Sequence, residues 1–192
     1  KNGRFQLQHS SLIQKYLLTL QTLQASKQVP VLDLACGKGR NGLYLVENDI
    51  NVNFADVNGE ALEQVEQSLK RLSSDKQKLA QCWHVDFEQA NTNPLHDKFF
   101  AAVMVFRYLH RPLFEQIKAM IKPGGMIIYE TFTEQQAQFG RPKNPDFLLK
   151  PRELIEQFSD WKILHSFDGV VNAPANGDVK QAIAQIVAIK PI

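Results

Sequence analysis

The distribution of apolar residues along the chain predicts strands that alternate with helices. Short segments rich in apolar residues predict strands that begin at residue 31 and at 50–57, 79–87, 99–106 and 126–132. The segment 99–106 is continuously apolar, which is typical of a buried parallel strand. Apolar residues three and four positions apart are typical of helices, which are predicted at 8–26, about 40–49, 60–72, 113–121 and 151–159. Two last strands, 161–167 and 181–189, flank a turn rich in Gly, Asn and Pro around 172–178 and predict a closing β-hairpin. This order of elements indicates an α/β fold with a doubly wound sheet.

The chain has 192 residues, which suits one well-buried core and is too short for two ordinary domains. Residues 1–192 are therefore expected to form a single domain. Within it, residues 1–28 form an N-terminal helical cap, which either packs on the core or covers the mouth of a ligand site. Residues 133–150 form a polar loop on the substrate side, either a lid over the substrate or a purely structural loop. The chain begins at Lys1 rather than Met, which leaves open whether a native N-terminal segment is missing.

Composition and charge narrow the range of partners. The chain carries 22 Lys and Arg against 20 Asp and Glu, and this formal net charge of +2 is too small for the broad basic surface that nucleic acid requires. It has no apolar run of about 18 residues and no signal peptide. We therefore expect a cytoplasmic protein without a membrane partner. Cys36 and Cys82 lack the spacing of a metal site, and another predicted strand separates the strands that carry them, too far for a disulfide. We expect no bound metal.

Gly37, Gly39 and Gly42 lie between the first predicted strand and a helix, in the spacing G-x-G-x-x-G. Glycine permits positive φ and has no Cβ, so a ligand can lie against bare backbone where the helix presents unpaired N–H groups. The spacing, with Asp56 nineteen residues after Gly37, is compatible with a dinucleotide. Asp33, four residues before Gly37, suits a cationic amino group better than a pyrophosphate. The turn is therefore predicted to be a binding site for one of these two ligand classes.

With these residues the chain resembles the class I S-adenosylmethionine-dependent methyltransferases, whose first motif is an acidic residue, two or three small residues and G-x-G. Ala35 stands where that family usually has glycine, and Lys-Pro-Gly-Gly at 122–125 precedes the fifth strand as it does in the family. The C-G-x-G-R-N sequence at 36–41 is most similar to the small tellurite-resistance-type methyltransferases. The resemblance implies a Rossmann-like sheet of seven strands in the order 3-2-1-4-5-7-6, with strand 7 antiparallel and helices on both faces. It also implies S-adenosyl-L-methionine as the cofactor and a small-molecule acceptor.

The residues expected to bind the cofactor lie near the carboxyl ends of the first four strands. Asp56, at the switch point of the sheet, is expected to accept hydrogen bonds from two ribose hydroxyls, with a helix cap as its alternative role. The resemblance places Asp86 against the adenine amino group, with a solvated turn as the alternative, and Phe87 against the ring. The full set is Asp33, Ala35, Gly37, Gly39, Arg40, Asn41, Asp56, Val57, Asp86, Phe87 and Phe106.

Four polar or ionisable side chains, Arg107, Tyr108, His110 and Arg111, leave the buried fourth strand together and should border the methyl donor. A strong general base is optional for methyl transfer, because the methyl group on a sulfonium is already electrophilic. Tyr108 and His110 are the catalytic candidates if the acceptor bears a proton, and a hydrogen-bonded structural histidine is the alternative for His110.

The residues expected to bind the acceptor are Arg107, Arg111, Glu130 and Arg141. The three arginines, with His110 and Lys143, are expected to converge on one mouth and to favour a small anionic acceptor, either an oxyanion or a carboxylate. The alternative is that some of these arginines brace the loop against acidic residues such as Asp146.

Three classes of function follow from these patterns. A methyltransferase accounts for the most motifs. A nicotinamide-dependent oxidoreductase rests on the glycine spacing, and a catalytically silent nucleoside-binding module would keep the fold without the reaction. The sequence leaves the acceptor and the oligomeric state open.

Overall fold

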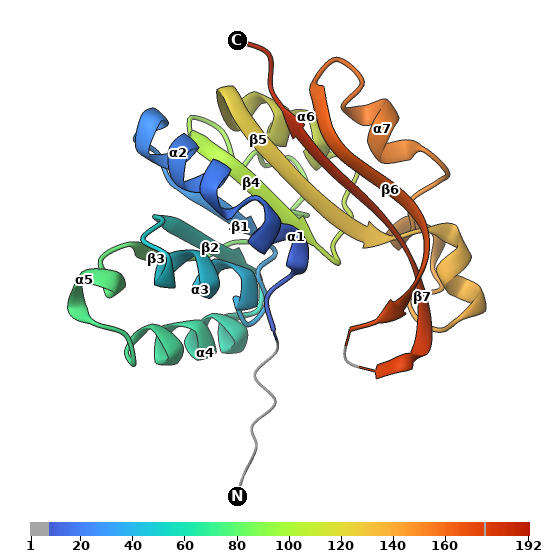
Figure 1. Ribbon diagram of the computed structural model, residues 1–192, viewed down its shortest axis with the longest axis horizontal. Coiled ribbons are helices and arrows are strands. Elements are labelled where there is room, and N and C mark those ends of the chain that lie inside the picture. Colours follow the sequence, from blue (N-terminus) through green and yellow to red (C-terminus); the bar gives the residue numbers. More distant parts are fainter. Residues whose placement is uncertain (1–7, 175) are drawn as a thin grey trace, which may run out of the picture.

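A computed structural model describes residues 8–174 and 176–192. These residues form one seven-stranded sheet in the order β3-β2-β1-β4-β5-β7-β6 (Figure 1), which confirms the expected order. Strand β7 runs antiparallel to both of its neighbours, while β1 to β5 pair in parallel. The strands are β1 (Val31–Leu34), β2 (Val52–Asp56), β3 (Ala80–His84), β4 (Phe100–Phe106), β5 (Ile121–Phe132), β6 (Lys162–Ala173) and β7 (Asn176–Ile189).

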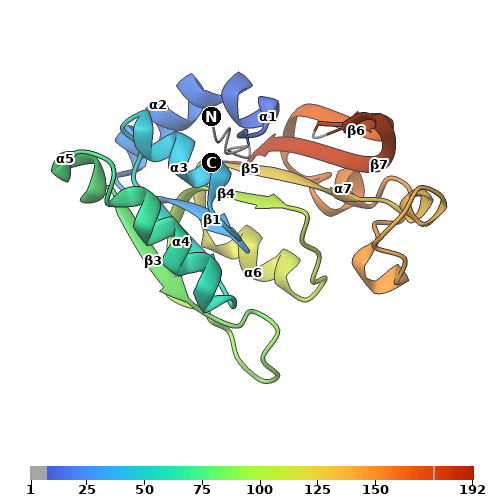
Figure 2. The ribbon, with the colours of Figure 1, turned by 90° about the horizontal axis from the view of Figure 1, so that it is seen from below.

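Helices cover both faces of the sheet. They are α1 (Ser11–Lys15), α2 (Leu17–Lys27), α3 (Arg40–Glu47), α4 (Gly59–Leu69), α5 (Ser74–Gln77), α6 (Leu113–Met120) and α7 (Glu153–Gln157), with short 3-10 helices η1 (Glu134–Gln138) and η2 (Pro145–Phe147). Figure 2 shows α2 and α6 on opposite sides of the central strands. None of the helices in the described residues is long and apolar enough to cross a membrane.

The alternation of side chains along the central strands divides the core into two layers. On β1, Val31 belongs to the layer under α1 to α4, whereas Leu32 and Leu34 belong to the layer under α6 and α7. All three side chains are completely buried. Such strands read as continuous apolar runs because both faces of a parallel sheet are covered. The buried strands therefore hold their carboxyl ends rigidly at one edge of the sheet.

Several predicted boundaries were wrong. The helix expected at 8–26 is two helices, because Ser10 caps α1 by accepting a hydrogen bond from the N–H of Leu12 and the chain turns again at Tyr16. The helix expected at 60–72 ends at Leu69 and is followed by α5. The third strand stops at His84 rather than 87, and the hairpin turn is much shorter than 172–178. Backbone pairing continues to Asn172 and Lys180 because ladder hydrogen bonds do not depend on polar or apolar side chains.

The glycine turn between β1 and α3 is packed so tightly that two of its glycines have no room for a side chain. A Cβ placed on Gly42 would lie 2.3 Å from the ring of Phe54 and 2.8 Å from Oδ2 of Asp33, and one on Gly39 would lie 2.8 Å from Val65. These two glycines let α3 approach β2 and α4 closely. Gly37 differs, since nothing lies within 4 Å of its Cβ position. Two glycines of the motif therefore serve packing, and one faces open space.

We expect Gly42→Ala to lower the free energy of unfolding by about 1 to 3 kcal/mol, because the added methyl group overpacks a rigid core. An alanine in a helix normally stabilises it, so the sign is diagnostic. Gly59→Ala is the matched control, because its Cβ would meet only the ring of His84 at 3.9 Å. The control should stay within about 1 kcal/mol of the wild type in urea denaturation. Equal midpoints for the two variants would contradict this packing role.

Candidate functional site

The candidate site lies at the carboxyl edge of the sheet, around the turn between β1 and α3. This turn has left-handed backbone at Ala35 (φ 53°), Gly37 (φ 54°) and Gly39 (φ 71°). This conformation is energetically unfavourable for Ala35, since residues other than glycine rarely adopt it. The strained geometry brings the backbone of Gly37 to the surface with free space beside it. This is where a ligand can approach the backbone closely.

Asp56, the last residue of β2, ties this turn to the neighbouring strand. Its Oδ2 accepts a hydrogen bond from the N–H of Gly37 at 2.7 Å, and its Oδ1 accepts one from the N–H of Asn58 at 2.8 Å. The N-cap of α4 is Asn58, whose side chain accepts from the N–H of Ala61, so the alternative role of Asp56 as a helix cap is not needed. Each carboxylate oxygen retains acceptor capacity for a ligand hydroxyl.

Asp33 is the buried carboxyl group beneath the turn. Its Oδ2 accepts a hydrogen bond from the N–H of Gly42 at 3.0 Å, and the residue is 3% exposed. Burial raises the pKa of Asp33 from 3.8 to about 8, against the opposing effects of the Gly42 hydrogen bond and the Arg40 charge. A cationic group of a ligand would compensate this desolvated carboxylate, as the sequence suggested.

Arg40 and Asn41, both expected to bind the cofactor, hold the N-terminal segment in the structure. Arg40 Nη1 donates to the carbonyl of Gln8 at 2.8 Å, and Oδ1 of Asn41 accepts from the N–H of Ser10 at 2.8 Å. Between them, the His9 ring stacks on Tyr44 with centroids 3.6 Å apart. The segment therefore docks on α3 directly beside the glycine turn.

The residues expected around the adenine differ in how available they are. Val57 is 60% exposed next to Asp56, and its carbonyl lies 2.8 Å from Nε2 of His84. Asp86 is exposed, and its Oδ1 accepts from the N–H of Glu88 within a turn. Phe87 is buried in the core and meets Trp83 edge to face, which weighs against the expected stacking on a ligand ring.

The two candidate bases also differ. Burial, followed by the neighbouring carboxylate of Glu88, raises the pKa of the Tyr108 phenol. A raised pKa keeps this phenol protonated at neutral pH, which disfavours Tyr108 as a general base. His110 is half-buried, and its carbonyl accepts from the N–H of Leu113 at the start of α6.

Arg111 braces the 133–150 loop, which was the expected alternative to binding the acceptor. Its Nε and Nη2 bind the two carboxylate oxygens of Glu153 at 2.7 and 3.0 Å. Its other contacts are to the carbonyls of Leu148 at 2.9 Å and Asp146 at 3.2 Å. The hydrogen bond to Glu153 raises the pKa of Arg111 above its usual value. These contacts fasten the 133–150 loop to the α6 side of the sheet.

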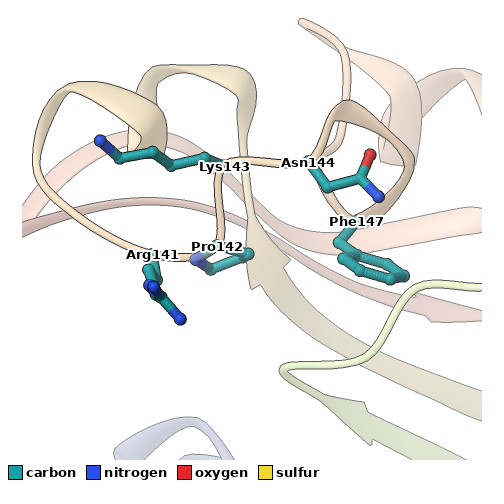
Figure 3. A pocket seen from close by; sticks show the side chains of 5 residues that line it. All are labelled: Arg141, Pro142, Lys143, Asn144 and Phe147. Carbon is teal, nitrogen blue, oxygen red and sulfur yellow. The ribbon is translucent and has the colours of Figure 1, made fainter.

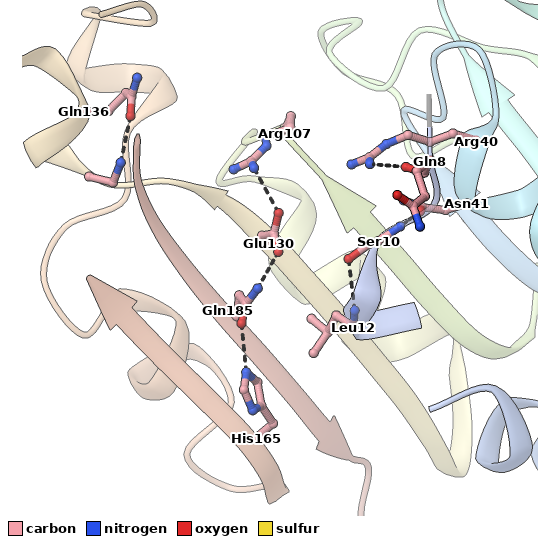
Figure 4. Close-up of polar contacts among 11 residues, drawn as sticks. Gln8, Ser10, Leu12, Arg40, Asn41, Arg107, Glu130, Gln136, His165 and Gln185 are labelled. Carbon is pink, nitrogen blue, oxygen red and sulfur yellow. Dashed lines mark hydrogen bonds and ion pairs between the residues drawn. The ribbon is translucent and has the colours of Figure 1, made fainter. Parts of the chain in front are cut away.

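Arg107 lines a cavity of about 340 Å³ together with Arg40, the residue that follows the glycine turn. Figure 4 shows the side chains of both arginines. Arg107 is the first residue after β4, has a positive φ of 58°, and its guanidinium lies over the Phe132 ring at 4.5 Å. Its Nη2 binds Oε1 of Glu130 at 3.1 Å. Arg40 lies on the same cavity, with its guanidinium 5.9 Å from the Phe106 ring. The cavity lining is Gln8, His9, Ser10, Ser11, Gln14, Arg40, Arg107, Glu130, Val171, Asn172, Pro174, Gln181, Ile183 and Gln185.

Arg141 and Lys143 line a different cavity, of about 570 Å³, with Pro142, Asn144 and Phe147 (Figure 3). The predicted convergence of five cationic groups on one mouth is therefore wrong: Arg107 lines one cavity, Arg141 and Lys143 line another, Arg111 is a brace, and His110 lines neither cavity. The loop is linked to β7 by Gln136, which donates to the Arg141 carbonyl and accepts from the Ala182 N–H.

One wall of the Arg107 cavity is the N-terminal segment around Gln8 and Ser10, for which covering a ligand site was one of the two expected roles. The other wall, the closing hairpin, was not predicted; Gln181, Ile183 and Gln185 line the cavity there. The spacing of these three residues by two along a strand puts them on one face, and two glutamines in an apolar strand were the available signal.

Comparisons with known proteins agree with this geometry. A family model described as "Tellurite resistance protein TehB" matches residues 8–180, and no curated protein sequence matches the chain. TehB from Haemophilus influenzae has a TM-score of 0.66 at 20% identity, over 88% of this chain and 61% of that one. The glycopeptide N-methyltransferase MtfA, solved with S-adenosyl-L-homocysteine, has a TM-score of 0.65 at 14% identity, over 100% and 93%. The cyclase SpnF has a TM-score of 0.64 at 16% identity, over 93% and 82%. The chain thus spans about three fifths of the length of the TehB structure.

We expect Asp33 to make the stability of the ligand-free protein fall as the pH rises. Between 3.8, its ordinary pKa, and about 8 in the folded state, the folded protein holds a proton that the unfolded chain has released. The stability gained by holding that proton is therefore largest below pH 4 and is lost towards pH 8, with a limiting slope of about 1.4 kcal/mol per pH unit.

Urea denaturation of the wild type and Asp33→Asn at several pH values between about 5 and 8 measures this effect, since contributions from other groups cancel in the difference. Asp75→Asn, on the exposed helix α5, is the control and should follow the wild type. If the Asp33→Asn curve runs parallel to the wild-type curve, the buried carboxyl is not the source.

Proposed function

This chain belongs to the family of the tellurite resistance protein TehB, and on that premise we propose that it transfers a methyl group from S-adenosyl-L-methionine to a small anionic acceptor. The observation that carries the proposal is the position of Arg40. It follows Gly39 of the open turn directly and also lines the cavity that contains Arg107. A cofactor at the turn and an anion in the cavity would therefore be neighbours.

The residues at the turn fit this cofactor. The free space at Gly37 leaves room for a ligand against the backbone, and Asp56 beside it offers charged acceptors to ribose hydroxyls. The desolvated Asp33 favours a nearby ammonium group, and the exposed side chain of Val57 offers apolar surface to a purine. When bound there, S-adenosyl-L-methionine would supply an electrophilic methyl group attached to a positively charged sulfur.

The cavity favours an anionic acceptor because two guanidinium groups, those of Arg40 and Arg107, line it. Burial lowers the pKa of Arg107, and the charge of Arg40 lowers it further while Glu130 opposes both. A small anion between two such groups would relieve their mutual repulsion. An anionic acceptor already carries a lone pair for the methyl carbon, so it needs no strong general base. This agrees with the raised pKa of the Tyr108 phenol.

In this proposal the chain itself orients the acceptor and excludes water. Holding an acceptor in line at about 3 Å from the methyl carbon supplies most of the catalysis in such a transfer. The N-terminal segment, fastened by Arg40 and Asn41, forms one wall of the cavity, and the hairpin forms another. The family match favours this reaction over the nicotinamide-dependent oxidoreductase that the glycine spacing also permits.

A methyl-transfer assay with labelled cofactor and a panel of acceptors tests the proposal. The panel contains tellurite, selenite, small carboxylates, RNA, DNA and a protein mixture. We expect methylation of a small anion, and Arg107→Ala should raise its KM by about tenfold or more while cofactor affinity stays within a factor of a few. Arg71→Ala, an exposed arginine after α4, is the control that should leave both unchanged. Methylation of macromolecules alone would refute the anionic acceptor.

A further inference from the structure

Four side chains, one directly after β4 and one each on β5, β7 and β6, form a continuous hydrogen-bonded row across this side of the sheet. Arg107 binds Glu130, Glu130 binds Gln185, and Gln185 binds His165 (Figure 4). Glu130 and Gln185 stand directly opposite each other in the antiparallel pairing of β5 with β7. Arg107 also donates its backbone N–H to the carbonyl of Glu130 at 2.8 Å. The row therefore reaches the cavity with its arginine and the outer strand with its histidine.

The chemistry of the row fixes the orientation of each member. Glu130 is 6% exposed and bound to a guanidinium, so it is an acceptor only. The Gln185 amide must therefore turn its NH₂ group towards Oε2 of Glu130 and its oxygen towards His165. His165 Nε2, 2.9 Å from that oxygen, must then be a donor. The acceptor role of Glu130 therefore fixes the orientation of the Gln185 amide, which in turn fixes His165 Nε2 as a donor.

This arrangement limits the ion pair between Arg107 and Glu130 to one point. The Gln185 amide holds Oε2 of Glu130 on the β7 side, Arg107 binds only Oε1 through Nη2, and Nη1 of Arg107 has no hydrogen-bond partner among the described residues. Guanidinium and carboxylate groups otherwise prefer a two-point contact. A buried, unpaired donor on a charged group is costly and requires a reason.

We propose that Gln185, oriented by His165, is a positioning residue that keeps Glu130 from binding Arg107 at two points and so leaves the guanidinium free for an anionic acceptor. This inference rests on the proposed function and extends it to the closing hairpin. Without the Gln185 amide, the Glu130 carboxylate is free to turn both oxygens towards the guanidinium of Arg107. The acceptor then competes with a fully formed internal ion pair.

The test measures binding of tellurite, as the probe, by calorimetry to protein saturated with S-adenosyl-L-homocysteine, so that no turnover occurs. Gln185→Met keeps the length of the side chain and removes its donor, and it should weaken tellurite binding by about tenfold. His165→Phe should weaken it in the same direction by less, because the amide is then free to flip. The matched controls are Gln81→Met on the exposed strand β3 and His96→Phe in an exposed loop, which should bind as the wild type does.

A double-mutant cycle separates positioning from a general structural effect. If Gln185 acts through Arg107, Gln185→Met should weaken binding no further in an Arg107→Ala background. The same loss in both backgrounds, or unchanged binding in Gln185→Met, would overturn the inference. If Gln185→Met does not fold by circular dichroism, His165→Phe and its own cycle with Arg107→Ala decide. If the wild-type protein binds neither S-adenosyl-L-homocysteine nor tellurite, the proposed function itself is overturned, and this inference with it.

Discussion

The site depends on one hydrogen bond, from the backbone N–H of Gly37 to the carboxylate of Asp56. The chain must leave a completely buried strand and enter α3 within five residues, which forces positive φ at Ala35, Gly37 and Gly39. Such a backbone persists only when its surroundings hold it. Asp56 supplies that restraint from β2, and the buried Asp33 supplies another through Gly42. Because both acids lie on strands fixed by the core, the open backbone of Gly37 is presented rigidly.

The polar side of the molecule is divided by charge. The glycine turn is bounded by acids, whereas the neighbouring cavity contains the guanidinium groups of Arg40 and Arg107. A cationic, ribose-bearing cofactor suits the first region, and an anion suits the second. Arg40 joins the two regions and at the same time holds the N-terminal segment through the Gln8 carbonyl. One residue thus links the turn, the cavity and a wall of that cavity.

The pattern of apolar residues predicted every strand and the α/β class, and it was clearest for the central strands β1 and β4, which are buried on both faces. The strand order came from the family resemblance, since spacing alone does not set the order of a sheet. Contacts distant in the sequence were out of reach. Arg111 finds Glu153 42 residues away, and Gln185 meets Glu130 only through the register of β5 with β7. The docking of Ser10 on Asn41, 31 residues away, was equally hidden.

In our proposal the glycine turn holds an adenosyl sulfonium cofactor rather than a dinucleotide. Thermal unfolding in the presence of S-adenosyl-L-homocysteine, S-adenosyl-L-methionine, NAD or NADP distinguishes these ligands, since a ligand that binds only the folded state raises the midpoint. We expect the two adenosyl ligands to raise the unfolding temperature of the wild type and to raise that of Asp56→Ala far less, and we expect no effect of NAD or NADP. A rise with NAD alone, or an equal rise in Asp56→Ala, would contradict it.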